Sequence, residues 1–229
     1  MADNENMSKV ENAFAGIVLA AQTFNPSIFT ETWLTQNGIV SADAFVGMRI
    51  FSPEVAQFQT EGLQVLVMPP KMQITFGIHG NANASELSQR IASRTVELLP
   101  HTPYQALGLN FDFFVAQPSG QDFSSYNRAL LGNGNNHLLR EFSAPDAKFG
   151  RYFSKNHGEA RLKLDIKPVQ AGPESKDLLH FSFNFHHEVS QLGSDARVRK
   201  LTQLIGGWTS LCEYAERLVN LGSMREASR

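Results

Sequence analysis

The sequence predicts an α+β domain with an antiparallel or mixed sheet of about six strands, helices mainly on one face and a polar opposite face. Residues 180–189 alternate between apolar and polar side chains, the period of a strand with one buried and one wet face. Residues 194–221 instead place apolar side chains at steps of three and four, which predicts one long amphipathic helix.

The first half of the chain reads mainly as strands. Residues 13–23 are continuously apolar, which predicts a strand buried on both faces at the centre of a sheet. A short helix is expected at 28–36, after capping residues next to Pro26. Further strand patterns cover 44–51, 55–59, 63–68 and 71–78, with a hairpin turn at 60–62 and a break at Pro69-Pro70.

The second half mixes helices and strands. A helix begins near Asn83 and stops before Pro100, and a strand is expected at 104–116. Residues 118–149 form the loosest region, with short helices expected at 123–131 and 137–142. Strand patterns return at 158–169 and 180–189, and we expect these two strands to pair antiparallel. A pseudo-duplicated ferredoxin-like arrangement would produce this order of elements.

Composition places the chain among ordinary globular proteins. Its 229 residues are 42% hydrophobic and 18% charged, and no linker is visible. We therefore expect a single domain over residues 13–222, with flexible tails at 1–12 and 223–229. The net charge of −2 gives no general attraction to nucleic acid or to an anionic membrane.

Cysteine content and hydropathy indicate a cytoplasmic protein. Cys212 stands alone, which excludes an intramolecular disulfide and a multi-cysteine zinc site and is typical of a reducing compartment. It lies on the apolar stripe of the last helix, as a buried structural thiol would. The apolar run at 13–21 is too short to span a bilayer, and the residues before it are net acidic, unlike a secretory signal.

The strongest candidate site is the polar face of the strand at 180–189. Its even positions are all polar, and neighbouring strands would add further polar side chains to the same face. The candidate binding residues are His180, Asn184, His186, Glu188, Asp112, Lys163 and Asp165.

A metal site is one interpretation of this cluster. His186 and Glu188 project the same way about 7 Å apart along the strand. Asp165, Asp112 or His79 could supply a third ligand for zinc, iron or manganese. The metal candidates are therefore His186, Glu188 and Asp165, although an exposed sheet face is more often simply polar, and we expect no cofactor.

His187 interrupts the alternation because it falls on the phenylalanine side of the strand. We expect a buried or edge histidine with a hydrogen-bonded ring. The alternative is a bulge that turns His187 to the same side as His186, where the pair could act as acid and base.

Nucleic acid is an unlikely partner. A basic patch exists with aromatic residues among its cations, but we expect the strand aromatics to lie on the buried face, where they cannot stack on bases. The patch consists of Arg151, Tyr152, Phe153, Lys155, Arg161, Lys163 and Lys167.

The leading hypothesis is an intracellular binding or assembly module without catalysis, acting through the polar sheet face or the long C-terminal helix. Its partner would be another protein or a second copy of the chain, giving a homo-oligomer, and no membrane partner is expected. The alternative is a metal-dependent or acid–base enzyme centred on His180, His186 and Glu188. The second alternative is a nucleic-acid-binding protein.

Overall fold

The computed structural model describes residues 9–78, 82–133, 137–171 and 175–223. The strands are β1 Lys9–Ala21, β2 Phe45–Phe51, β3 Ala56–Thr60, β4 Leu63–Met68, β5 Lys71–Gly77, β6 Tyr104–Ala116, β7 Arg151–His157, β8 Ala160–Ala171 and β9 Lys176–Glu188. The helices are α1 Glu31–Gln36, α2 Ala82–Leu98, α3 Phe123–Leu131, α4 His137–Glu141, α5 Ser194–Gly206 and α6 Trp208–Ser223, with short 3-10 turns at Pro26–Ile28 and Ala42–Ala44.

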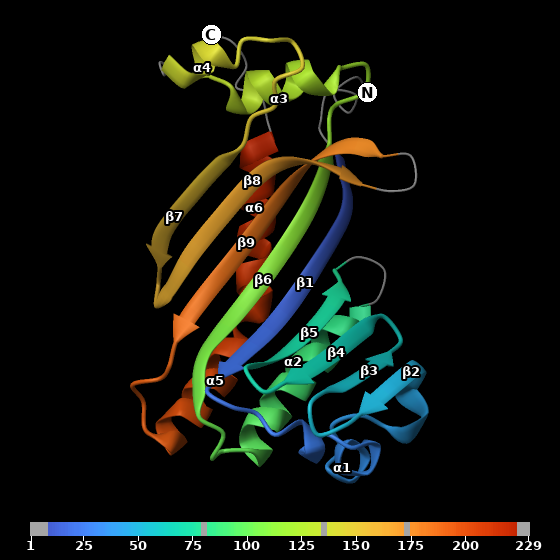
Figure 1. Cartoon of the computed structure of the whole chain (residues 1–229). Coiled ribbons are helices and arrows are strands. Elements are labelled where there is room, and N and C mark those ends of the chain that lie inside the picture. The colour runs from blue at the N-terminus through green and yellow to red at the C-terminus, as the bar shows by residue number, and fades with distance from the viewer. Residues whose placement is uncertain (1–8, 79–81, 134–136, 172–174, 224–229) are drawn as a thin grey trace.

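Over these ranges the strands form one antiparallel sheet in the order β2-β3-β4-β5-β1-β6-β9-β8-β7 (Figure 1). The α+β class with an antiparallel sheet is therefore confirmed. The nine strands found within the described ranges exceed the roughly six expected. Helices α2, α5 and α6 lie behind the sheet in Figure 1, so that its other face is turned toward the viewer.

The centre of the sheet is the antiparallel pair β1–β6. Their register runs from Lys9 opposite Ala116 to Ala21 opposite Tyr104. On its other side β1 pairs with β5, the last strand of the β2–β5 meander, and β6 pairs with β9, the last strand of the β7–β9 meander. Both halves thus contain a strand, helices, a meander and a covering helix, while the ferredoxin-like arrangement stays a prediction.

Alternation in β9 works as the sequence predicts. Phe181, Phe183 and Phe185 are fully buried on the helix side. Phe183 packs edge-to-face on Phe113 of β6, with ring centroids 5.9 Å apart, and Phe185 packs in the same way on Phe111 at 5.8 Å. The antiparallel pairing of β9 with β8 is also confirmed.

The long C-terminal helix was predicted wrongly as one piece. It breaks at Gly206-Gly207 into α5 and α6, because glycine is a poor helix residue and two occur together. The Gly207 N–H turns back to the carbonyl of Leu204 at 3.1 Å. The break places Trp208 between the two halves of the sheet, with ring centroids 5.6 Å from Phe76 of β5 and 5.3 Å from Phe111 of β6.

Two further boundaries differ from expectation. The strand β7 at Arg151–His157 was missed, because its aromatic neighbours Tyr152 and Phe153 are both exposed and its pattern shows no buried row. β1 begins at Lys9, so part of the expected tail at 1–12 belongs to the sheet. Residues 1–8 and 224–229 of the expected tails lie outside the described ranges.

Helix α6 carries Cys212, which is buried as expected. Burial raises the pKa of its thiol to about 12, which keeps it protonated and unreactive at neutral pH. No helix in the described part of the chain is long and apolar enough to cross a membrane.

Replacing Phe183 by alanine should destabilise the fold by about 3–5 kcal/mol, because it leaves a cavity in a closely packed core. Phe153→Ala on the edge strand β7 is the matched control, since that ring is already about half exposed. Urea unfolding of both variants would measure the difference. Equal losses of stability in the two variants would contradict the assigned β9 register.

Candidate functional site

The candidate surface is the open face, defined here as the side of the sheet opposite α2, α5 and α6 (Figure 1). The register assigns to it the even-numbered residues of β1 from Asn12 onward, those of β6 and β9, and the odd-numbered residues of β8. All seven predicted binding residues belong to this face. They are His180, Asn184, His186, Glu188, Asp112, Lys163 and Asp165.

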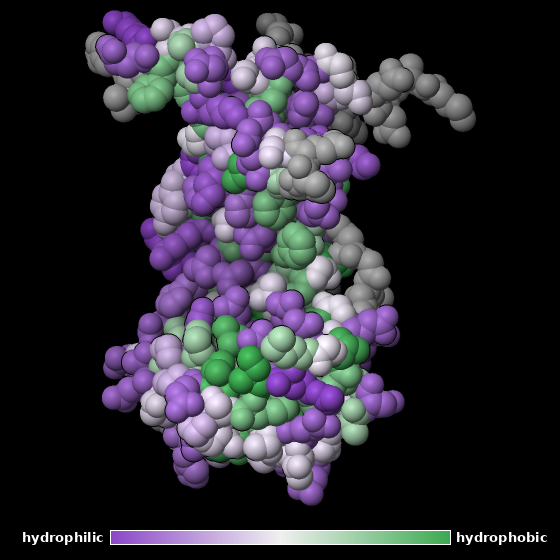
Figure 2. Space-filling model, turned by 45° about the vertical axis from the view of Figure 1, so that its right-hand side comes forward, coloured by the Kyte–Doolittle hydropathy of each residue, from purple (hydrophilic) through white to green (hydrophobic). Residues whose placement is uncertain are grey.

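The face divides into two parts of different chemistry. The charged half consists of the open-face side chains of β6, β9, β8 and β7. The neutral half consists of those of β2, β3, β4 and β5. The prediction of a polar face therefore holds for the charged half only, because the neutral half mixes apolar side chains with glutamines. Figure 2 shows a hydrophobic patch low on the molecule, over the short strands, beside a hydrophilic region.

One side-chain contact of the charged half joins β6 to β9. His180 Nε2 lies 2.8 Å from Asp112 Oδ1, at hydrogen-bonding distance. The His180 ring also stacks flat on Phe114, with centroids 4.5 Å apart and an interplanar angle of 4°. The carboxylate and the stacked ring together fix the orientation of the imidazole. Such a pair could bind a polar group or exchange a proton with a ligand.

A second polar pair lies further along the same two strands. Asn184 Nδ2 donates to Asn110 Oδ1 at 2.6 Å. On the neighbouring strand β8, Lys163 lies opposite Asn184 and Asp165 lies opposite Ser182. Lys167 pairs with Asp165 at 3.1 Å along the same strand. The charged half is thus a mixed-sign surface with two side-chain bridges across β6 and β9.

The strand register separates residues that the sequence grouped together. His180 and His186 are about 20 Å apart along β9, since six steps of about 3.3–3.4 Å separate them. His186 approaches Glu188, two residues along the same strand, with Nε2 and Oε2 3.7 Å apart. An acid–base enzyme centred on His180, His186 and Glu188 would therefore have to use two distant places, the pair His186–Glu188 and the pair that His180 forms with Asp112.

The predicted metal set is also spread out. Asp165 lies opposite Ser182, whereas His186 lies opposite Arg161, so about 13 Å of strand separate the carboxylate from the imidazole. No group of three or more histidine, cysteine, aspartate or glutamate side chains that could hold a metal occurs among the described residues. The third candidate ligand His79 lies outside those residues.

His187 lies on the helix side of β9, as expected for a buried histidine. The alternative of a bulge is wrong, because the β6–β9 register is regular through Leu107 opposite His187. The ring is only 6% exposed, and neither of its nitrogens has a hydrogen-bond partner in the described structure. The expected hydrogen-bonded ring is therefore not found. Burial lowers the pKa of His187, against an opposing effect of Glu159, whose carboxylate pairs with Lys200.

Aromatic side chains on the open face were missed. Phe14 is 43% exposed and Tyr152 is 61% exposed, and Phe114 packs against Phe14 at 6.1 Å. The expectation that strand aromatics are all buried is wrong. β1 and β6 carry apolar residues on both faces, so their sequences do not show which of these residues point outward. Alternation shows that Phe14 points to the opposite side from Ala13 and Ala15. It does not show which of the two sides is buried.

The predicted basic patch is divided between the two sides of the sheet. Arg161, Lys163 and Lys167 belong to the open face. Lys155 reaches the other side, where its Nζ donates to the hydroxyl of Tyr214 on α6 at 2.8 Å. Arg151 donates to backbone oxygens of Leu131 and Asn133 instead of presenting a free cation.

The burial of His187 makes stability depend on pH. Its pKa is lower in the folded chain than in the unfolded one, so the unfolded state binds the proton more readily. The resulting loss of stability is absent above the unfolded pKa of about 6.5 and grows as the pH falls below it. We expect His187→Leu to gain stability over the wild type progressively between pH 7.5 and pH 5, measured by thermal unfolding. A difference in stability that is the same at every pH would contradict this assignment.

Comparison with known proteins gives no functional assignment. No model of a known protein family matches the chain, and no curated protein matches it. Function is therefore argued from the geometry of the open face.

Proposed function

We propose that the chain is a cytoplasmic, non-catalytic binding module that holds a protein partner on the charged half of its open face. The observation that carries the proposal is the pair of side-chain bridges, His180–Asp112 and Asn184–Asn110, on a surface that no described helix covers. Side chains that are already ordered lose less conformational entropy when a partner binds, so they favour recognition. A buried, protonated Cys212 fits a reducing compartment.

The composition of the charged half suits a protein partner better than a nucleic acid. The cations Arg161, Lys163 and Lys167 share the face with carboxylates, since Asp165 lies between two of them on β8 and Asp112 lies on β6, two strands away. A phosphate backbone would meet these carboxylates, whereas a protein surface can offer charges of both signs.

The C-terminal helices are a weaker candidate for the binding surface. Trp208, Cys212, Ala215 and Val219 form the apolar stripe of α6, and all four are buried against the chain's own sheet. Leu201 and Ile205 of α5 are buried too. The broad apolar face that suggested association in the sequence is thus used for folding, which favours the sheet face.

Reversing two charges of the charged half should abolish partner binding. The test variant is Lys163→Glu with Lys167→Glu, and the matched control is Arg90→Glu with Arg199→Glu, which makes the same charge change on exposed positions of α2 and α5. Affinity capture from the native cell, quantified by mass spectrometry, should recover the same proteins with wild type and control. We expect the test variant to lose these proteins about tenfold or more.

The outcome that would contradict the proposal is a set of captured proteins that the charge reversal leaves unchanged. Thermal unfolding of both double variants would verify that each remains folded, so that a loss of binding reports on the surface and not on the fold.

Nucleic-acid binding is the second candidate, favoured by the exposed ring of Tyr152 beside the cations of β8 and by the exposed ring of Phe14 on β1 of the same face. These two rings are poorly arranged for stacking successive bases, because β6, β9 and β8 lie between the strands that carry them. We therefore expect no retention on heparin at about 150 mM salt and no binding of single-stranded RNA that weakens steeply with salt. Salt-dependent RNA binding that is lost in Phe14→Ala would instead favour this candidate.

A further inference from the structure

The edge strand β7 is unpaired along its outer side. It ends the strand order of the sheet, so within the described ranges no further strand lies beyond it (Figure 1). Its seven residues pair one for one with β8, from Arg151 opposite Ile166 to His157 opposite Ala160, without a bulge. None of the seven is buried, and none is a proline. β7 therefore lacks the bulge and the proline by which edge strands often prevent further pairing.

The turn after β7 determines which of its backbone groups face outward. The two-residue turn Gly158-Glu159 joins β7 to β8, with Gly158 at a φ of 57°. Such a turn makes its flanking residues, His157 and Ala160, a hydrogen-bonded pair, and these pairs alternate along an antiparallel ladder. The residues whose N–H and C=O groups point away from β8 are therefore Tyr152, Ser154 and Asn156. An extended chain beside β7 would meet a donor and an acceptor at every second residue.

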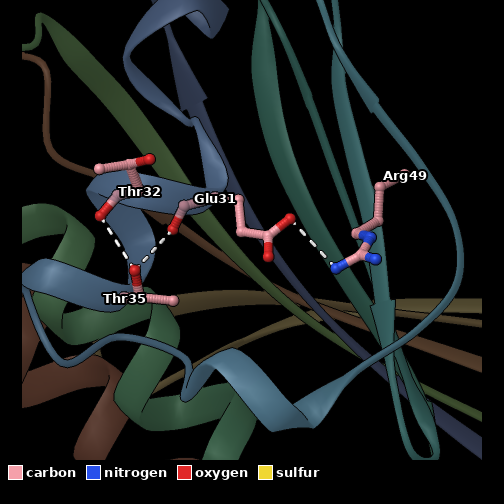
Figure 3. A network of polar contacts seen from close by, with 4 residues as sticks. All are labelled: Glu31, Thr32, Thr35 and Arg49. Atoms are coloured by element: carbon pink, nitrogen blue, oxygen red, sulfur yellow. Dashed lines mark hydrogen bonds and ion pairs between the residues drawn. The ribbon is translucent and has the colours of Figure 1, made fainter.

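The opposite edge of the sheet is unsuited to such pairing. Val46 pairs with Gln59 and Ile50 with Gln57, so β2 has two more residues than β3 over the same interval. A strand with this bulge cannot pair regularly with a further strand. Arg49 also ties β2 to α1, because its guanidinium lies 3.1 Å from the carboxylate of Glu31 (Figure 3). β7 is therefore the edge at which the sheet can be extended.

The cations of β7 are directed toward their own chain. Lys155 Nζ donates to the hydroxyl of Tyr214 on α6 at 2.8 Å. Arg151 donates to the backbone carbonyls of Leu131 and Asn133 at 3.3 and 2.9 Å. A lysine that extends along an edge deters a further strand, whereas Lys155 lies against α6. The acceptors of both side chains are neutral, so the positive charge beside the edge remains.

The hairpin of β7 and β8 carries uncompensated positive charge. Both of its carboxylates are already paired, Asp165 with Lys167 and Glu159 with Lys200. The other cations of the hairpin form no ion pair with any residue that the structure describes. They are Arg151 and Lys155, on the helix side of the sheet, and Arg161 and Lys163, on the open face. Positive charge therefore flanks the edge on both sides.

We infer that the outer edge of β7 binds an extended acidic segment of a partner protein, which adds to the sheet as a further strand. The segment pairs with the outward backbone groups of β7, and its alternate side chains lie on the two sides of the sheet. Carboxylates on these side chains are attracted by the uncompensated cations. Apolar side chains pack beside Tyr152 and Phe153, whose rings are 61% and 48% exposed on opposite sides of β7.

A second copy of the chain suits this edge less well than an acidic segment. β7 contains cations but no carboxylate, so a second β7 paired with it offers no acidic side chain in any register. A separate segment can supply carboxylates on both sides of the edge. Charge complementarity therefore favours the acidic segment as the occupant.

Selection from a library of random peptides of about ten residues, displayed on phage, would test the inference with the full chain immobilised. The recovered peptides should be rich in aspartate and glutamate and in β-branched or aromatic residues. Synthetic versions in which amides replace every carboxylate should bind about tenfold more weakly. Recovery of peptides without acidic residues, or amide versions that bind equally well, would contradict the inference.

The variant Ser154→Pro tests the backbone pairing. It removes an outward N–H that β8 does not use, and proline is tolerated at such a position of an edge strand. Ser154→Ala is the matched control, because it keeps the N–H and equally loses the hydroxyl contact to the Leu162 carbonyl at 3.3 Å. Fluorescence anisotropy should show the selected peptides binding at least about tenfold more weakly to Ser154→Pro than to Ser154→Ala. Equal binding to the two variants would overturn the inference.

N-methylation of a selected peptide tests the same pairing without a change in the protein, should Ser154→Pro fail to fold. Only alternate residues of an added strand direct their N–H groups to β7. Methyl groups on that set should abolish binding, whereas methyl groups on the other set should leave it nearly unchanged. Equal effects of the two sets would rule out strand addition. Sedimentation equilibrium of the wild type tests the occupant, since a dimer that Ser154→Pro dissociates would show that a second copy takes the edge.

This inference does not depend on the proposed function. Ser154→Pro leaves the His180–Asp112 and Asn184–Asn110 bridges in place, together with the cations of β8. Capture of a partner by the charged half can therefore succeed when peptide binding at the edge fails, and the reverse holds for charge reversal at Lys167, which is already paired with Asp165.

Discussion

The ladder between β1 and β6 is the constraint on which the rest of the structure depends. It joins the two meanders into one sheet and fixes the parity of each neighbouring strand. Because Ile17 and Leu109 face the helices, Gly16 and Asn110 must face outward, and the same rule extends to His180 and His186 on β9. A slip of one residue in this ladder would exchange the core with the open face. Trp208 reinforces the join from the helix side, touching Phe76 of one half and Phe111 of the other.

Much of this fold could be predicted from alternation and helical periodicity. The strand at Tyr104–Ala116 and the helix at Phe123–Leu131 have the expected bounds. The edge strand β7 was missed because an edge strand buries little and shows little alternation. The break at Gly206-Gly207 was missed because apolar residues keep the same spacing on both sides of it, although the glycine pair was visible in the sequence. The spacing of apolar residues indicates which side of a helix or strand is buried. It does not indicate where the backbone changes direction.

The residue types of the candidate site and the sheet face that they share could be predicted. Which of these side chains lie close together could not. The polar parity of β9 correctly assigned His180, Asn184, His186 and Glu188 to one face, but a shared face is not a shared site when the strand is this long. The pair His180–Asp112 depends on the register between β6 and β9, which no local pattern contains. The neutral half was missed for a related reason. Its strands alternate as buried strands do, and alternation does not reveal which faces a helix will cover.

The position of β1 has a consequence for the order in which the chain folds. Ribosomes synthesise β1 with its partner β5 long before β6, since even the closest residues of the ladder, Ala21 and Tyr104, are separated by the whole first meander and α2. During that interval one side of β1 carries unpaired N–H and C=O groups along a run of alanine, glycine, isoleucine, valine and leucine, the kind of edge that recruits strands from other chains. The arrival of β6 closes this edge. The open edge then passes to β6 itself, whose far side stays unpaired until β9 at Lys176–Glu188 has been made, so this half-sheet can recruit strands from other chains until late in synthesis.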